Sequence, residues 1–588
     1  MAHYDAIIRG GLIHDGTGVS PFTGDIGIRG DRIVEIGSIA GDADTVIDAI
    51  GKIVTPGFVD VHTHYDGQAT WEQRLVPSSG HGVTTVVVGN CGVGFAPCRE
   101  NDRNMLVAVM EGVEDVPEVV MTAGLPWNWE TFPQYLDALA ERSFDIDLAT
   151  QLPHSALRVF VMGKRGADRS PPTLEDLQEM RRLTAQAIRA GALGVSTSRN
   201  LMHRTKAGEL APSLFSEEDE LIALAEGLAD ADAGVFQIIP NIAQDASDEF
   251  KLIAHLARTA KRPLSYSLLQ MPGRPDGEWR TMLKLTGEAI EQGLEIKAQV
   301  APRPVGILYG LELSFHPFAL HPSFKAIADS SLADKVAIMR DPAFRQKLLL
   351  EQAEDSNPVS LKTVNDFPLA FPMGDPPVYD PVPELRLDRQ AAALGITPYE
   401  LAYDMLLERD GKALLYRPGA NFVDGDFRAI HEMLVDPNTI VGLADGGAHY
   451  GLICDGSFPT YFLLRWSRDA ATQERISLTD AIVALTSQTA QAVGLYDRGV
   501  LSVGMKADIN VIDIDELTLH APEVAYDLPT GGRRLHQRAD GYVATFVSGR
   551  LTYAEGKATG ELPGRLVRGG QSAAHPLSDG RHGHVRRL

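Results

Sequence analysis

The sequence predicts an α/β protein built on a (β/α)8 TIM-like barrel, with a small β-sandwich domain formed by both ends of the chain. Eight short apolar runs, separated by helical segments, lie between about residues 56 and 500. Strand-like pieces broken by glycine and aspartate occupy the first 55 residues and return after about residue 500. A chain of 588 residues with 44% hydrophobic residues is long enough for such a barrel and a second domain.

The strand-like pieces at the two ends predict one β-domain. Residues 1–55 hold short apolar runs separated by turn signals such as Gly10-Gly11 and Gly30-Asp31, a spacing typical of small antiparallel strands. Similar runs occur in residues 507–513 and 542–550. Because chain termini often lie close in space, we expect residues 1–55 and 501–566 to fold together. Residues 567–588 read as a C-terminal tail.

Residues 56–500 are assigned to the barrel. Its strands are expected at Val59–His64, Val83–Val88, Asp147–Leu152, Ala192–Ser196, Gly234–Ile239, Leu264–Leu269, Glu295–Val300 and Thr439–Leu443. Helices lie between them: Thr173 and Asp176 form a predicted capping pair ahead of one, as do Ser216 and Asp219 ahead of another. Alternating strands and helices are typical of βα units, and a closed parallel barrel requires eight strands.

Two long segments interrupt this alternation. Residues of about 101–145 and of about 301–435 are far longer than ordinary connections between a strand and a helix. Loops that follow barrel strands line the active-site face, so such insertions can shape a substrate pocket. Structural elaboration or an oligomer contact is the alternative.

Charge and cysteine content narrow the functional classes. Lys and Arg total 54 against 78 Asp and Glu, a net charge of −24, which argues against nucleic acid or an anionic membrane surface as partner. Three cysteines in so long a chain do not form a disulfide framework. The N-terminus lacks a secretory pattern, and no run of apolar residues is long enough to span a membrane. We therefore expect a cytoplasmic protein.

The first barrel strand ends in two histidines, His62 and His64, spaced by one residue. Residues i and i+2 of a strand point to the same side, which suits two imidazoles on one metal ion. Cys91 follows the second strand and would face the same mouth, where a metal would hold it as a thiolate. Asp445 follows the eighth strand, which lies beside the first in a closed barrel. It could therefore bind the metal and accept a proton from water.

These motifs resemble the amidohydrolase superfamily. Pro56-Gly57-Phe58 with Asp60-Val61-His62-Thr63-His64 is similar to the opening signature of that superfamily. The D-aminoacylase (N-acyl-D-amino-acid deacylase) branch is indicated by the segments 82–92, 157–163, 191–197 and 541–565. The resemblance implies the barrel and β-sandwich, zinc at the barrel mouth, and hydrolysis of a non-peptide amide by water. It implies that His62 and His64 are metal ligands, Cys91 a ligand or bridge, and Asp445 the general base.

The sequence departs from that branch at strands five and six. Members have a metal-binding histidine at each, whereas Val235–Pro240 and Pro263–Gln270 contain none. Four remaining ligands, His62, His64, Cys91 and Asp445, are enough for one zinc with an open position for water. We therefore expect one zinc ion, and the sequence leaves open whether a second one binds.

The substrate is expected to be a small-molecule amide. His449, Arg199, Arg303, Gln237 and Gln270 are candidate substrate-binding residues on βα loops or near strand ends, and Gln299 lies at a strand end as well. One alternative is a hydantoinase-like hydrolase of cyclic amides, in which Lys164 would be the carboxylated lysine. Another is a barrel without catalysis that binds a ligand. Stereochemistry and a homo-oligomeric state are left open.

Overall fold

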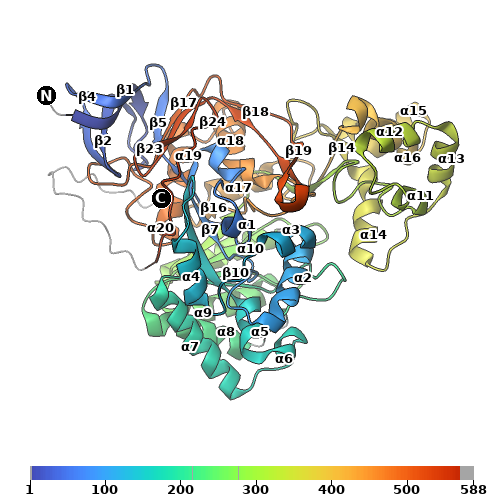
Figure 1. The fold of residues 1–588 in the computed structure, drawn as a ribbon, viewed down its shortest axis with the longest axis horizontal. Helices are drawn as coiled ribbons and strands as arrows, with labels where there is room; N and C mark the ends of the chain where they lie inside the picture. The colour runs from blue at the N-terminus through green and yellow to red at the C-terminus, as the bar shows by residue number, and fades with distance from the viewer. Residues whose placement is uncertain (1–2, 215, 217, 276, 570–588) are drawn as a thin grey trace.

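The protein is described by a computed structural model over residues 3–214, 216, 218–275 and 277–569, and its centre is a curled sheet of eight parallel strands (Figure 1). The strands lie in the order β16-β12-β11-β10-β9-β8-β7-β6. Their bounds are β6 Phe58–Asp60, β7 Val83–Val88, β8 Asp147–Pro153, β9 Gly194–Ser198, β10 Val235–Ile239, β11 Leu264–Ser267, β12 Ile296–Val300 and β16 Thr439–Val441. The predicted barrel is therefore confirmed, and each predicted segment overlaps one of its strands.

The barrel closes through residues that follow its first and last strands. We expected the first strand to reach His64, but β6 ends at Asp60. Beyond it, Asp445 N donates to His62 O at 3.0 Å and His64 N donates to Gly446 O at 2.8 Å. These two bonds join the segments after β6 and β16. Asp445 has a φ of 47°, so the chain leaves the extended conformation there and a regular strand ladder cannot continue.

Helices connect the strands and cover the outside of the barrel (Figure 1). The predicted helix behind Thr173 is α7, where Thr173 accepts from Asp176 N and the Asp176 side chain closes a capping box. The helices that follow strands β6, β8 to β12 and β16 are α1 Gln68–Trp71, α5 His154–Met162, α6 Lys164–Ala167, α7 Leu174–Ala190, α8 Glu218–Ala231, α9 Ala246–Ala260, α10 Glu278–Glu291, α17 Arg428–Val435, α18 Phe458–Phe462, α19 Leu478–Leu485 and α20 Ser487–Ala492.

The two ends of the chain share one sheet, as predicted. β5 (Ile53–Pro56) pairs antiparallel with β17 (Ile509–Ile512), with Val54 opposite Val511. The other strands of this sheet are β1 His3–Ile13, β2 Phe22–Arg29, β3 Arg32–Gly37, β4 Asp42–Asp48, β22 Tyr542–Val547, β23 Arg550–Ala554 and β24 Lys557–Ala558. Isoleucine, valine and alanine side chains from both chain ends fill its core. The fold class expected from the sequence is thus confirmed.

The two insertions fold differently. Residues 101–145 form α2 Arg103–Glu114, α3 Glu118–Gly124 and α4 Phe132–Ala140, which pack on the main core. Most of residues 301–435 form a separate lobe with its own apolar core (Figure 1). Its elements are β13 Val305–Tyr309, α11 Pro322–Lys325, α12 Leu332–Met339, α13 Pro342–Leu350, α14 Pro358–Asn365, β14 Phe371–Pro372, α15 Leu387–Leu394, α16 Pro398–Leu406 and β15 Leu415–Ala420. The second segment is therefore a packed structure and not an extended loop.

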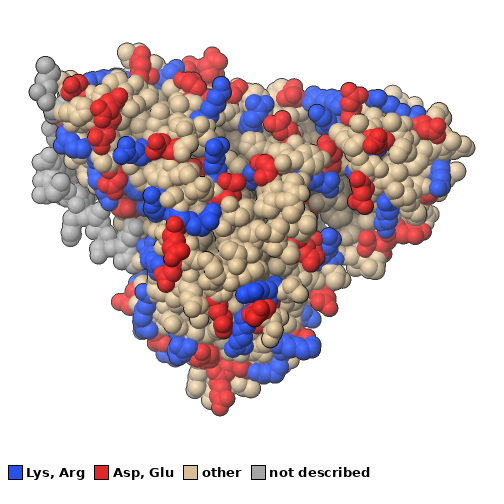
Figure 2. All heavy atoms as spheres, viewed as in Figure 1, with Lys and Arg blue, Asp and Glu red and all other residues tan. Residues whose placement is uncertain are grey.

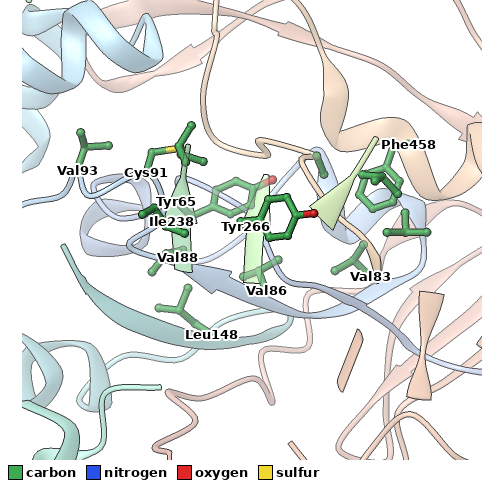
Figure 3. Close-up of a cluster of buried hydrophobic side chains, with 14 of the residues drawn as sticks. Tyr65, Val83, Val86, Val88, Cys91, Val93, Leu148, Ile238, Tyr266 and Phe458 are labelled. Atoms are coloured by element: carbon green, nitrogen blue, oxygen red, sulfur yellow. The ribbon is translucent and has the colours of Figure 1, made fainter. Parts of the chain in front are cut away.

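Apolar side chains fill the space around the central strands. Figure 3 shows Val86, Val88 and Leu148 near one another, below Tyr65 and Tyr266 in this view, with Cys91 beside Val93. Two small two-stranded sheets complete the fold: β18 Thr518–Leu519 with β21 Ala539–Asp540, and β19 Glu523–Leu528 with β20 Gly532–His536. Of the predicted tail, residues 570–588 lie outside the described part of the chain.

The surface is mixed in charge. Acidic and basic side chains alternate over the face shown in Figure 2. Cys91, Cys98 and Cys454 are buried and form no disulfide. In the portion of the chain that the structure describes, no helix combines the length and apolar character needed to cross a membrane.

Candidate active site

Three loops at the carboxyl ends of β6, β7 and β16 bring four predicted residues together. Cys91 Sγ lies 3.3 Å from His62 Nε2. Asp445 Oδ1 lies 3.4 Å from His62 Nε2 and 3.6 Å from His64 Nε2. His62, His64 and Cys91 are buried, whereas the Asp445 side chain is 20% exposed. The cluster is therefore open to solvent at Asp445.

The backbone holds these side chains in unusual conformations. Cys91, Asp445 and His449 have φ values of 56°, 47° and 55°, in the left-handed region that non-glycine residues rarely adopt. Such conformations persist where the surrounding structure enforces them, and they gather at functional sites. At Gly447, with φ +85°, a Cβ atom would lie 2.9 Å from the main-chain carbon of His64. A glycine is needed there for the loop after β16 to reach the histidines.

Neighbouring polar groups orient the first histidine. His62 Nδ1 donates to Gln299 Oε1 at 2.7 Å, which leaves Nε2 facing Cys91 and Asp445. Burial lowers the pKa of His62 to about 4, so the ring is neutral at pH 7 and Nε2 keeps a free lone pair. Gln237 Oε1, on β10, accepts from Cys91 N at 3.3 Å. Strand five therefore supports the site through Gln237 although it contains no histidine, and strand seven, β12, does so through Gln299.

Charges around Asp445 keep it ionised. Burial alone would raise the pKa of this carboxyl, but His449 and His64 outweigh burial and hold the pKa well below its usual range. The same contacts act on His449: burial opposes its protonation, yet Asp445 and Glu114 raise its pKa to about 9. His449 Nε2 lies 3.7 Å from Asp445 Oδ2 and 3.7 Å from Glu114 Oε2. At neutral pH the site thus contains the Asp445 carboxylate beside a protonated imidazole.

The donor set fits a divalent metal ion. His62, His64 and Cys91 offer ligand atoms that all lie within 4.8 Å of one another. Both ring nitrogens of His64 and Oδ1 of Asp445 are buried without a hydrogen-bond partner among the described residues. Ligand atoms bound tetrahedrally to one zinc at about 2.0–2.3 Å lie about 3.4 Å apart, close to the separations measured here. A bound cation would satisfy these atoms, whose burial without partners is otherwise costly.

Comparison with known proteins identifies the family. Residues 45–553 match the sequence profile described as the amidohydrolase family. The chain belongs to the amidohydrolase family. It is therefore a hydrolase acting on carbon–nitrogen bonds other than peptide bonds. This amidohydrolase is 26% identical to a D-aminoacylase of Alcaligenes xylosoxydans xylosoxydans over 581 residues, covering 96% of this chain and 97% of the relative.

Two further comparisons concern the fold and the extent of the similarity. The amidohydrolase superposes on an N-acyl-D-glutamate deacylase of Bordetella bronchiseptica, solved with zinc and a phosphonate inhibitor, with a TM-score of 0.65. The two sequences are 24% identical, and the match covers 96% of this chain and all of the other. A D-hydantoinase of Rhizobium radiobacter is 38% identical over only 90 residues, 14% of this chain and 19% of the hydantoinase. The match to the deacylases spans the chain, whereas that to the hydantoinase is local.

Three of the predicted substrate-binding residues of the amidohydrolase are engaged elsewhere. Arg199 Nε pairs with Glu249 Oε1 at 2.8 Å. Arg303 is 1% exposed and pairs with Asp455 at 2.7 Å. Gln270 bonds through its main-chain N to Asn421 and through Nε2 to Asp424 at 2.9 Å. Their polar groups have protein partners, whereas the His449 side chain is 24% exposed beside Asp445 and Gln237 Nε2 has no hydrogen-bond partner among the described residues.

Sequence reasoning missed Glu114, which faces both His64 and His449. Glu114 is the last residue of α2 and is 2% exposed. Its position four residues after the buried Met110 and eight after Leu106 places it on the apolar face of that helix. An acidic residue on the apolar face of a predicted helix is unusual, and this pattern could have pointed to Glu114 from the sequence. A second neighbour is His203, after β9: burial and the charges of His64 and His449 lower its pKa to about 3.

Proposed function

We propose that this amidohydrolase hydrolyses the amide bond of a small N-acyl amino acid, with one zinc ion held by His62, His64, Cys91 and Asp445. The observation that carries the proposal is the convergence of these four side chains from three loops on one point of the barrel mouth. The full-length similarity to a D-aminoacylase supports an N-acyl-D-amino acid as the substrate class.

The protein ligands differ in how they prepare the site. His62 is held as a neutral ring by burial and by Gln299. Burial raises the pKa of the Cys91 thiol well above its ordinary value, so this group is protonated before metal binding and loses its proton on coordination. When bound, a zinc ion would polarise the amide carbonyl and lower the pKa of a water molecule.

Asp445 is the proposed general base. Its carboxylate is ionised at neutral pH and its side chain is 20% exposed. It would take one proton from the attacking water as the carbon–oxygen bond forms. It would then deliver that proton to the leaving nitrogen as the carbon–nitrogen bond breaks. The products are a carboxylate and an amine, and no other reactant is needed.

His449 is the proposed contact for the substrate. Its side chain is 24% exposed and is held by two carboxylates, which raise its pKa to about 9. A protonated imidazole at this position can attract the carboxylate of an N-acyl amino acid. This replaces the role expected for Arg199 and Arg303, whose side chains are less exposed, at 16% and 2%.

One ion fits the residues better than two. β10 and β11 contribute Gln237 and Ser267 near their carboxyl ends and no imidazole. A hydantoinase-like mechanism has less support, because Lys164 lies on α6, is 85% exposed and pairs with Asp168 at 2.6 Å. A lysine there is far from a buried position in which it could bridge metals.

The test compares wild type with Asp445→Asn on a panel of N-acetyl-D- and N-acetyl-L-amino acids. Zinc per chain is measured in both proteins by elemental analysis. We expect one zinc in the wild type, hydrolysis of at least one D substrate, and a loss of about 10²–10⁴-fold in kcat/KM in the variant. Hydrolysis that is unchanged in Asp445→Asn would refute the assignment of the base. Two tightly held ions per chain would refute the single-metal site, and no hydrolysis across a wide amide panel would favour a ligand-binding barrel.

A further inference from the structure

The end of helix α2 is fixed to the loop that holds Asp445 and His449. Glu114 O accepts from His449 N at 2.5 Å. The next residue, Asp115, accepts from Gly451 N at 2.8 Å and from Ser314 Oγ. The insertion after β7 is thereby joined to the loop after β16, and the main chain at Glu114 is held beside His449.

The Glu114 carboxylate lies between two imidazoles of the active site. Oε1 is 3.5 Å from His64 Nδ1, and Oε2 is 3.7 Å from His449 Nε2. Within the described residues, no lysine or arginine pairs with Glu114, and Oε1 has no hydrogen-bond partner. A carboxylate with 2% exposure is costly to bury, and the cationic groups available to it here are the imidazoles of the site. A purely structural role does not account for it.

His64 is also incompletely bonded. Both of its ring nitrogens are buried without a hydrogen-bond partner in the described part of the protein. Nδ1 faces Glu114, and Nε2 faces Asp445 Oδ1 at 3.6 Å. His62 has the same arrangement: Nδ1 donates to Gln299, and Nε2 faces Asp445 Oδ1 at 3.4 Å. In each histidine, Nε2 thus faces Asp445 Oδ1 and Nδ1 faces a side-chain oxygen that can accept a hydrogen bond.

We propose that Glu114 is a positioning residue that accepts a hydrogen bond from the Nδ1–H group of His64. The proton then stays on Nδ1, and Nε2 is free to bind the metal. This inference rests on the proposed metal site. Metal-binding histidines donate their second ring nitrogen to a carboxylate or carbonyl, which fixes the tautomer and the ring orientation. Gln299 does this for His62, and Glu114 does it for His64. Because β10 and β11 supply no imidazole, metal binding depends on His62 and His64. The hydrogen bonds that fix the tautomer of these two rings therefore matter more.

The experiment measures zinc affinity and the stability of the metal-free protein separately. Glu114→Leu removes the acceptor with little change in volume, and Glu114→Gln keeps an oxygen that can accept from Nδ1. Zinc affinity is obtained by competition with a chelator. We expect Glu114→Leu to weaken zinc binding about 10–100-fold and Glu114→Gln to weaken it less. In the metal-free state Glu114→Gln should melt close to wild type, because it keeps the shape of the side chain and an oxygen that can accept a hydrogen bond.

Glu111→Gln is the matched control. Glu111 lies on the same helix and pairs with the exposed Lys206 at 2.8 Å, so its substitution should leave zinc affinity unchanged. The inference is overturned if Glu114→Leu binds zinc within twofold of wild type. It is also overturned if both Glu114 variants lower the melting temperature of the metal-free protein, which indicates a structural role.

A further variant separates this inference from the proposed function. His64→Ala should lose tight zinc binding. If His64→Ala loses zinc while both Glu114 variants bind it normally, only the role of Glu114 is wrong. If His64→Ala binds zinc as wild type does, the metal site itself is wrong, and the role of Glu114 fails with it.

Discussion

Gln299 connects His62 to the interior of the barrel. Its Oε1 accepts from His62 Nδ1 at 2.7 Å, while its Nε2 donates to Ser265 Oγ, on β11, at 2.9 Å. The amide is therefore fixed at both ends, and its carbonyl oxygen is the atom directed at the histidine. The bond from His62 Nδ1 to Gln299 therefore leaves Nε2 as the free nitrogen of His62.

Gln299→Leu should weaken metal binding. The substitution removes the acceptor for His62 Nδ1, so the ring loses its preferred tautomer and orientation, and we expect zinc affinity to fall about 10–100-fold. Zinc retained after dialysis against a graded chelator series measures the effect. Gln299→Glu keeps the acceptor oxygen and should retain more zinc than the leucine variant. Equal zinc retention in wild type and Gln299→Leu would show that the bond to His62 is irrelevant to the metal.

Zinc binding should release a proton from Cys91. Burial keeps the thiol protonated at pH 7 in the metal-free protein, and a metal binds only the thiolate. Cys91→Ala should therefore release about one proton fewer per zinc than wild type. Calorimetry in buffers of different ionisation enthalpy gives the proton count. The assignment of Cys91 as a ligand fails if the two proteins release the same number.

Asp147 should be essential for stability. This carboxylate, at the start of β8, lies 2.7 Å from Arg498 and 2.5 Å from Lys506, and all three are buried. Asp147→Ala leaves two buried cations with less compensation, and we expect a loss of about 3–5 kcal/mol in the free energy of unfolding. Denaturant titration measures it. The control is Asp137→Ala, which breaks an exposed pair with Arg568 and should cost below about 1 kcal/mol. Similar costs for both variants would contradict the prediction.

His81 should make the fold sensitive to acid. Its Nδ1 lies 2.8 Å from Thr460 Oγ1 and its Nε2 donates to Gln537 O at 2.9 Å, and burial lowers its pKa to about 3. The unfolded chain takes up this proton below about pH 6.5 and the folded chain only near pH 3. Stability from His81 is therefore complete above pH 6.5 and falls as the pH is lowered. At pH 5 the loss is about 2 kcal/mol.

The substitution His81→Gln isolates this contribution from that of other buried histidines. The cost of the substitution, measured by denaturation at pH 7 and at pH 5, should be about 2 kcal/mol smaller at pH 5. An equal cost at both pH values would mean that His81 is protonated in the folded protein, contrary to its bonding to Gln537 O.

Local sequence patterns were enough to predict the barrel. Apolar runs such as Val83–Val88 fit a strand buried on both sides, and the Thr173 and Asp176 pair marks where α7 begins. Since all parallel strands of a barrel end at one mouth, strand ends alone indicated that His62, Cys91 and Asp445 meet. The positions of Arg303 and Gln270 could not be deduced this way, because their partners, Asp455 and Asp424, are distant in sequence.

By itself, the sequence determined the barrel, the shared β-domain and the group of histidines, cysteine and aspartate at the barrel mouth. Only the tertiary structure decided that Glu114 joins them. Its position depends on how α2 packs and on the turn at Asp115, where φ is 53°, and both are set by contacts with the loop after β16. Strand ends are encoded by short-range periodicity, whereas the reach of a side chain from a long insertion depends on non-local packing.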